Sequence, residues 1–416
     1  MRSSPFWWVF IAFMVLLDLY VFQAVKIIVS SSGPRARVIV YSVYWVLSVA
    51  AVIVLILLPY LNLQSISRVF RSSVFAIIAG LFFAKLVAAL FFLTDDLRRG
   101  VQWVAGKIFT TGKGTVSPGE GDRISRSLFL SWAGLAAGGG LFGSLVYGFG
   151  NKYRYQVKKK QLAFKNLPTP FKGLKIVHIS DIHSGSFSDK EAVNKGIDLV
   201  LAQKPDLILF TGDLVNDRAD EMDNYKDIFS RLTAPMGVFS TLGNHDYGDY
   251  TQWKSETEKR QNLERLKEVH AGMGWRLMMD EHHILEKGND RIALLGVQNI
   301  SGRGRFKSYG DLSKAYAGLE KDSFKILMSH DPSHWDAEVR KQYTDIQLML
   351  SGHTHGMQFG VEIPGFRWSP VQYIYKQWAG LYETGDQKLY VNRGFGFIGY
   401  PGRVGILPEI TVIELI

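Results

Sequence analysis

The sequence of 416 residues contains no cysteine. The protein therefore forms no disulfide and offers no thiolate ligand for a metal site. Because disulfide content is what usually separates secreted from cytosolic proteins, this absence also leaves the compartment undefined. The sequence shows no internal repeat and no low-complexity tract of the disordered kind.

Residues 166–416 lack an excess of basic side chains. They carry 29 Lys and Arg against 33 Asp and Glu, whereas residues 1–165 carry 19 against 5. Binding to the phosphates of nucleic acids requires clustered Lys and Arg, so the acidic balance argues against nucleic acid as the main substrate. The first part therefore carries a net charge of +14 and the rest −4, so the +10 of the whole chain comes from its first part.

Long apolar stretches dominate that first part. They cover residues 5–29, 38–60, 72–93 and 128–149. Each is about long enough to cross a hydrocarbon core of roughly 30 Å, so we expect a multi-pass membrane module over residues 1–150 that contacts lipids. Asp18 and Lys85 fall inside the first and third stretches, where an ionisable group is costly and usually meets a partner. We expect these two residues to form an ion pair.

Two polar segments flank the fourth stretch. The connection over residues 94–126 contains glycine and charged residues, and a short interfacial piece is expected from 97 to 109. Residues 151–171 are expected to form a basic juxtamembrane linker, in which Arg154 and several lysines are interleaved with Tyr153 and Tyr155. The composition favours a charged membrane flank, and the alternative is a collar that attracts anionic lipid head groups.

Clusters of acids, histidines and one asparagine follow one another along the remaining residues. They are Asp181-x-His183, Gly212-Asp213, Gly243-Asn244-His245-Asp246, His330 and Gly352-His353-Thr354-His355. Each directly follows an apolar, β-branched run, at 176–179, 207–210, 238–242, 324–328 and 346–350. Such runs predict buried strands, and the carboxyl ends of strands are where open α/β sheets gather their ligands. The i, i+2 spacing within the first and last clusters turns both side chains to the same side.

The residue types in these clusters favour a centre with two metal ions. A carboxylate can bridge two cations, while imidazoles and an amide oxygen suit ions such as Mn, Fe or Zn. Buried acids and histidines would be costly without a metal to compensate them. Two such ions activate water near neutral pH and neutralise phosphoryl oxygens during in-line attack. The sequence therefore predicts a two-metal hydrolase.

These residues resemble the calcineurin-like metallophosphoesterases, whose pattern is D-x-H, G-D, G-N-H-[DE], H and G-H-x-H in this order. The resemblance covers residues 172–416, which we expect to form the phosphoesterase domain. Further motifs are similar to the membrane-associated bacterial branch of that family, at 352–356, 378–382, 391–394 and 408–411. Met357 departs from this branch, in which a second glycine usually follows Gly356.

The resemblance assigns a role to each residue of the clusters. It implies two divalent ions of the Mn, Fe or Zn type, the first held by Asp181, His183 and His355, the second by Asn244, His330 and His353, with Asp213 bridging both. It makes His245 the general acid that protonates the leaving oxygen and gives Asp246 the task of orienting its ring. Asn216 and Asp217 follow the Gly212-Asp213 turn, where the family often has another acid or amide, and ordinary turn chemistry is the alternative.

What the resemblance implies about function is a metal-dependent hydrolase of a phosphodiester, phosphomonoester or pyrophosphate. Lipid-linked substrates are included, and a nucleotide-diacylglucosamine pyrophosphate is one candidate. Cations of a glycine-rich loop and of a strand end are expected to hold a second phosphate unless they are merely solvated: Arg303, Arg305, Lys307 and Arg393. The alternative function is a non-catalytic membrane scaffold that uses the fold for docking. Because His245 and all seven ligands are present, the sequence favours the enzyme. The oligomeric state is not defined.

The fold that the resemblance supplies is a four-layer α-β-β-α sandwich with two mixed sheets, preceded by the helical membrane module. Periodicity alone supports alternating strands and helices, with helices over 190–203, 251–271 and 311–319. The other histidines are expected to be structural: His178, His270, His282, His283 and His334.

The distribution of Lys and Arg does not decide on which side of the membrane the phosphoesterase domain lies. With an outward N-terminus, the inside loops hold eight of these residues and the other side holds nine. Residues 125–130, Ser-Arg-Ser-Leu-Phe-Leu, resemble the S-R-R-x-F-L leader of proteins exported by the twin-arginine route. Ser127 replaces the second arginine of that leader. Since the leader stays in the cytoplasm and its passenger leaves, we expect an extracytoplasmic phosphoesterase domain.

Overall fold

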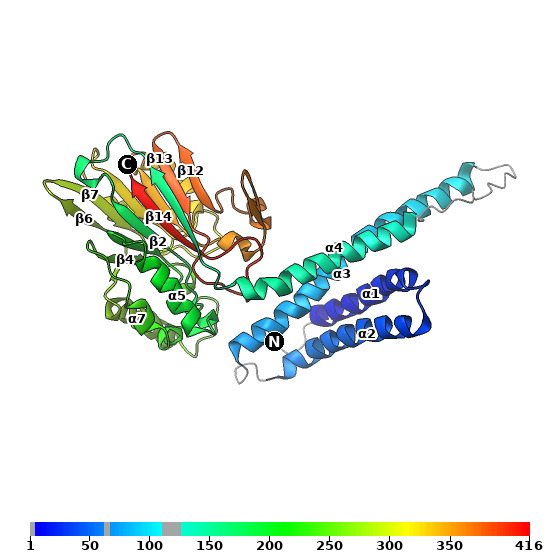
Figure 1. The fold of residues 1–416 in the computed structure, drawn as a ribbon. Coiled ribbons are helices and arrows are strands. Elements are labelled where there is room, and N and C mark those ends of the chain that lie inside the picture. Colours follow the sequence, from blue (N-terminus) through cyan, green and yellow to red (C-terminus); the bar gives the residue numbers. More distant parts are fainter. Residues whose placement is uncertain (1–4, 62–66, 110–125) are drawn as a thin grey trace. The chain divides into compact units, whose positions relative to one another are not determined.

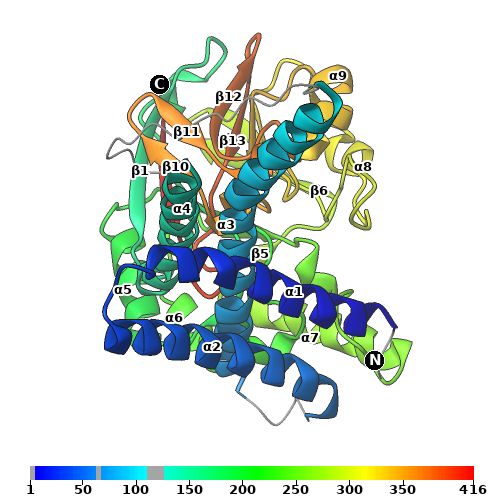
Figure 2. The same cartoon turned by 90° about the vertical axis from the view of Figure 1, so that its right-hand side faces the viewer.

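The structure is a computed structural model that describes residues 5–61, 67–109 and 126–416. The chain divides into two compact units, Met1–Tyr147 and Gly148–Ile416. The described part of the first unit is helical, and the second unit contains the sheets (Figures 1 and 2).

The first unit is formed by long apolar helices. Among the described residues these are α1 (Pro5–Ile28), α2 (Pro34–Leu57), α3 (Arg68–Phe109) and α4 (Arg126–Gly148). Each of the four contains a stretch long and apolar enough to cross a membrane. The predicted apolar stretches therefore form helices that are long and apolar enough to span a membrane.

Helix α3 is longer than expected, because it continues through the predicted connection to Phe109. The expected break at residue 94 and the separate interfacial piece are therefore wrong. Arg98 forms an ion pair with Asp95, three residues before it, and Arg99 pairs with Asp96 in the same way. Pairs at this spacing stabilise a helix, so the charged residues that lower the hydropathy also extend α3. The rest of the expected connection, residues 110–125, lies outside the described residues.

A buried ion pair joins α1 and α3. The ammonium group of Lys85 contacts the Asp18 carboxylate and lies 2.8 Å from the hydroxyl of Ser48 on α2. Ser48 donates to the same carboxylate oxygen at 3.2 Å. The expected pairing of Asp18 with Lys85 is found, and Ser48 satisfies further hydrogen bonds of the two charges.

The strands of the second unit form two six-stranded mixed sheets and a separate hairpin. Sheet A has the order β1 (Gln156–Leu162), β14 (Glu409–Leu415), β2 (Lys175–Ile179), β3 (Leu207–Thr211), β4 (Val238–Thr241), β5 (Arg276–Leu277). Sheet B has the order β12 (Gly380–Thr384), β13 (Gln387–Val391), β9 (Leu348–Ser351), β8 (Lys325–Met328), β7 (Asp290–Gly296), β6 (Glu281–Lys287). The hairpin pairs β10 (Val361–Ile363) with β11 (Phe366–Trp368).

The sheets lie face to face with helices outside them (Figure 1). Residues of both sheets, such as Ile176 and Ile326, share one apolar cluster between them. The outer face of sheet A packs against α5 (Lys190–Leu201), α6 (Lys226–Phe229) and α7 (Glu256–Gly272). The outer face of sheet B packs against α8 (Leu312–Tyr316) and the helical turns up to α9 (Arg340–Gln342). The predicted α-β-β-α fold is confirmed, and α8 is shorter than the expected helix.

The topology brings the sequence clusters to one edge of the sandwich. Strands β2, β3 and β4 are parallel neighbours in sheet A, and β8 and β9 are parallel neighbours in sheet B. They match the predicted apolar runs, and each is followed by one of the clusters. Carboxyl ends of parallel strands meet at the same edge, so the clusters of each sheet lie side by side.

The expected basic linker is part of the sheet. Residues 156–162 form β1, which pairs in parallel with β14 along its whole length. Lys158, Lys159 and Lys160 are consecutive on this edge strand, so their side chains point alternately to the two faces of the sheet. Directly before it, the last residues of the fourth candidate span, 148–151, belong to the second unit. The Gly148 carbonyl accepts from the Arg403 amide at 2.9 Å, which fixes the end of that span to the loop before β14.

Candidate metal centre

The loops after the strands hold their polar side chains in a strained backbone conformation. Asp181, His183, Asp213, His353 and His355 all have positive φ, between 49° and 72°. Residues with a side chain rarely adopt this left-handed region, and such strain is concentrated at functional sites. Glycines allow the loops to approach closely, since a Cβ on Gly352 would lie 2.1 Å from an oxygen of Asp181. The backbone is thus shaped around these side chains.

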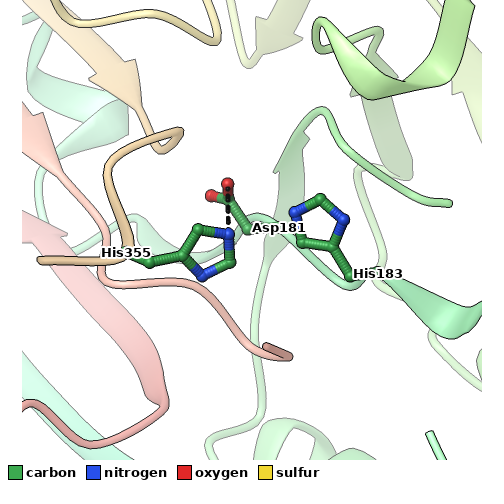
Figure 3. Close-up of side chains that lie close together, drawn as sticks. All are labelled: Asp181, His183 and His355. Atoms are coloured by element: carbon green, nitrogen blue, oxygen red, sulfur yellow. Dashed lines mark ion pairs between the residues drawn. The ribbon is translucent and has the colours of Figure 1, made fainter. Parts of the chain in front are cut away.

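The first group consists of Asp181, His183 and His355, whose potential ligand atoms lie within 4.8 Å of one another (Figure 3). His355 Nε2 lies 3.2 Å from Asp181 Oδ1, and the two imidazole rings stack at 5.0 Å between centroids. The Asp181 carboxylate also accepts from the amide of His353 at 3.0 Å. The members come from the loops after β2 and β9, so the group joins the two sheets.

The second group consists of Asp213, His330 and His353. His330 Nε2 lies 3.1 Å from Asp213 Oδ2, and His353 Nδ1 lies 3.3 Å from the same imidazole nitrogen. Asn244 adds its side-chain oxygen at 2.8 Å from His353 Nδ1. The other nitrogen of His330 donates to the carbonyl of Thr211 at 2.7 Å, which leaves Nε2 free to bind an ion.

Asp213 stands between the two groups. Its Oδ2 lies 3.1 Å from His330 Nε2 and 3.5 Å from His183 Nε2. Its other oxygen accepts from the amide of His245 at 2.9 Å. Despite burial, which acts in the opposite direction, the neighbouring imidazoles hold the pKa of Asp213 well below its usual value. The carboxylate is therefore charged and placed to serve both groups.

The donor set fits two divalent cations. Both ring nitrogens of His183 and Nε2 of His355 are buried without a hydrogen-bond partner in the described structure. Burial lowers the pKa of His183 to about 3, so its imidazole is neutral, the form that binds metals. Burial also raises the pKa of Asp181 to about 6. Unpartnered buried nitrogens beside buried carboxylates are costly unless an ion compensates them.

His245 lies beside the groups without belonging to either. Its ring is 5.0 Å from that of His183, and its Nδ1 lies 2.8 Å from the carbonyl oxygen of Asn216. A carbonyl only accepts, so Nδ1 carries a proton and Nε2 is the nitrogen available for proton transfer. Asn216 therefore touches the site through its backbone.

Asp246 does not orient His245, and this expectation is wrong. Its two oxygens accept from the backbone amides of Asp213, Leu214, Val215 and Gly243, at 2.8 to 3.3 Å. The carboxylate thereby ties the loop after β3 to the loop after β4. The orienting contact to His245 comes instead from Asn216, which the motif does not identify.

Further residues surround the centre that sequence reasoning did not predict. Tyr375 places its hydroxyl 2.9 Å from His353 Nε2 and thus fixes that ring with Nδ1 toward the second group. The ring of Tyr250 lies 4.6 Å from that of His245, and Phe306 lies 4.7 Å from His353. Arg403 is fully buried and donates to the carbonyl of His355 at 3.2 Å. No motif signals these contacts, because each joins residues that lie far apart in sequence or in different loops.

The cations expected to hold a second phosphate differ in their surroundings. Arg393 is buried, with 4% of its surface exposed, and pairs with Glu409 and Glu362. It therefore serves the structure of the domain. Arg303 and Arg305 are exposed in the loop that carries Phe306, and Arg303 lies over the ring of Tyr375 at 5.3 Å.

The remaining histidines are engaged outside the two groups. Buried His178 contacts the Thr211 hydroxyl at 2.8 Å, and buried His270 contacts that of Ser240 at 3.0 Å. His282, His283 and His334 also have hydrogen-bond partners away from the metal ligands. These contacts support the structural role expected for all five.

The backbone conformation at Met357 is one that favours glycine. Its φ of 55° lies in the left-handed region, where a residue without a Cβ is favoured. Half of its side-chain surface is exposed, at 50%. The loop after His355 thus keeps at Met357 the backbone conformation that glycine favours.

Comparisons with known proteins identify families and relatives that this chain resembles. Residues 174–357 match the family described as calcineurin-like phosphoesterase, and residues 1–151 match the family described as its probable transmembrane domain. The chain is 30% identical to the uncharacterised metallophosphoesterase YkuE of Bacillus subtilis, over 70% of this chain and 98% of that protein. It is 29% identical to the phosphodiesterase YaeI of Escherichia coli, over 63% of this chain and 88% of that protein.

A longer relative occurs in an animal. The transmembrane protein with metallophosphoesterase domain of Danio rerio is 29% identical over 65% of this chain. The match spans 60% of the length of that relative.

Proposed function

Because the chain belongs to the calcineurin-like phosphoesterase family, we propose that it is a membrane-anchored hydrolase of phosphoesters that uses two divalent metal ions. The observation that carries the proposal is the pair of facing groups with the Asp213 carboxylate between them. The alternative of a non-catalytic scaffold has no support from an eroded site, since every ligand type is present.

We assign the residues as follows. Asp181, His183 and His355 would hold one ion, Asn244, His330 and His353 would hold the other, and Asp213 would be shared by both. When bound, the two ions would supply water activated near neutral pH and would neutralise phosphoryl oxygens. His245 donates a proton from Nε2 to the leaving oxygen, while the Asn216 carbonyl holds Nδ1. Asp246 keeps the two loops of sheet A at the spacing that the centre requires.

The surroundings of the centre favour a phosphoester with an apolar or ring-shaped group. Tyr250 and Phe306 lie against the imidazoles of His245 and His353, and their own rings are 6.4 Å apart at 90°. Exposed Arg303 and Arg305 in the same loop provide positive charge for a second phosphate, as in a pyrophosphate. Aromatic faces and guanidinium groups together suit a phosphodiester or pyrophosphate, and the membrane module favours a lipid-linked one.

Hydrolysis and its metal dependence can be tested on the full chain. Purified in detergent and supplied with Mn²⁺, the protein is expected to hydrolyse bis(p-nitrophenyl) phosphate. A chelator should abolish the activity, and renewed Mn²⁺ should restore it, because both groups need an ion to offset their buried donors. Protein that contains metal yet is inert toward monoesters and diesters would contradict the proposal and favour the scaffold.

We further propose that the catalytic unit lies outside the cytoplasm. The support is the leader-like segment 125–130, which coincides with the start of α4 at Arg126. Alkaline phosphatase fused after Ile416 is then expected to be active, and green fluorescent protein fused at the same position is expected to be dark. Bright fluorescence without phosphatase activity would reverse the orientation and make a cytosolic nucleotide-lipid accessible.

A further inference from the structure

The hairpin formed by β10 and β11, labelled in Figure 2, has one apolar face that is largely exposed. Val361 is paired with Trp368, and Ile363 is paired with Phe366, so these four side chains share one face. Val361, Ile363 and Phe366 are exposed, with 43%, 59% and 54% of their surfaces accessible. Exposed Tyr373 extends this face, because the Trp368 indole donates to its hydroxyl at 3.4 Å.

The opposite face of the hairpin carries the charges and points into the domain. Glu362 lies 2.8 Å from the guanidinium of Arg393 and 3.3 Å from the ammonium of Lys158 on β1. Arg367 donates to the carbonyl of Ala379 and lies 5.0 Å from the ring of Tyr382. A shift of one residue in a strand would exchange the faces, and these contacts exclude it. The outward apolar face is therefore specified.

This hairpin begins close to the end of a candidate membrane span. The Gly148 carbonyl, in the last turn of that span, accepts from the Arg403 amide, and the next carbonyl, of Val404, accepts from Gly360 at 2.9 Å. Gly360 directly precedes β10. Two such backbone links correspond to about 10 Å, as neighbouring strands lie about 4.8 Å apart. The head-group layer on each side of a bilayer is roughly 5–8 Å thick, so the hairpin starts near its level.

We propose that the outer face of the β10–β11 hairpin, with Tyr373, is a membrane-contact surface that inserts into the interfacial layer of the lipid bilayer. Exposed apolar patches of this kind mark interaction sites, and aromatic side chains are favoured at membrane interfaces. The occupant is lipid because the hairpin starts within two backbone links of Gly148, a residue that belongs to a candidate membrane span. The proposal concerns the surface alone and does not depend on catalysis.

The absence of cysteine makes a direct test possible, since one introduced thiol can be labelled without a background. Full-length Phe366→Cys, carrying a fluorescent label, is placed in nanodiscs of phosphatidylcholine and phosphatidylglycerol. The matched control is Asn289→Cys, at the exposed turn between β6 and β7 of the same domain. Phe366 lies at the start of β11 and Asn289 lies in a turn, and both residues are exposed, so neither label disturbs the core.

The label on residue 366 is expected to be quenched by nitroxide-bearing lipids and to be protected from iodide in the water. The label on residue 289 should show the reverse. Equal quenching of both labels by iodide would overturn the proposal. Protection of residue 366 from both quenchers would overturn it too, because a protein partner, such as a second copy of the chain, would then cover the hairpin.

Discussion

Replacing Asp213 by alanine is expected to empty at least one of the two proposed ion positions and to reduce hydrolysis by about 10³-fold or more, since ions contribute several kcal/mol of charge stabilisation. The Asp213 carboxylate is the group that approaches imidazoles of both groups, at 3.1 and 3.5 Å. Without it, the remaining donors would hold two like charges with no anion between them. Metal content is measured by mass spectrometry of the purified protein, alongside initial rates.

Asp198→Ala serves as the matched control for Asp213→Ala. Asp198 is an exposed acid on α5 that pairs with Arg231, so its loss should change neither metal content nor rate. If Asp213→Ala retained two ions per chain, the bridging role would be wrong even if the rate fell.

Replacing His245 by alanine is expected to leave both ions bound and to lower the rate by roughly 10² to 10⁴, the usual range for a lost general acid. Its ring contacts the site but belongs to neither group of ligands. A substrate with a nitrophenolate leaving group should lose least, because that group departs without needing a proton. An alkyl phosphodiester should lose most. The two substrates are compared by their kcat values.

His283→Ala controls for the removal of an imidazole. His283 lies on β6, contacts Arg276 and takes no part in the two groups, so both substrates should be hydrolysed at the original rate. A His245→Ala protein that loses an ion, or loses equal activity toward both substrates, would contradict its role as the acid.

Much of the phosphoesterase fold could be predicted from local sequence. The runs that became β2, β3, β4, β8 and β9 are short, apolar and β-branched, and each ends at a polar cluster. Their pattern agrees with their buried environment, so propensity and burial favour the same structure. Asp181 and His183, which follow β2 directly, also fall in one group, as their spacing predicts.

Features that depend on distant contacts could not be predicted. The composition of the basic segment 156–162 predicts a solvated linker, but the segment forms β1 because residues 409–415 provide a parallel partner. The position of Asp246 beside His245 predicts a contact with that imidazole, but its carboxylate accepts hydrogen bonds from backbone amides near residue 213. Arg403 gives no local signal at all, because its partners include His355, 48 residues away.

The pairing of β1 with β14 also has a consequence for biosynthesis. Gln156, just after the last candidate span, pairs with Glu409, and Leu162 pairs with Leu415. In sheet A, β14 lies between β1 and β2. While the ribosome produces the intervening residues, β1 therefore has no paired strand, and the edge of β2 that later pairs with β14 is open. Contacts of such large sequence separation form late. Sheet A therefore completes only after translation reaches β14, and until then the membrane-inserted nascent chain exposes open strand edges to chaperones and proteases.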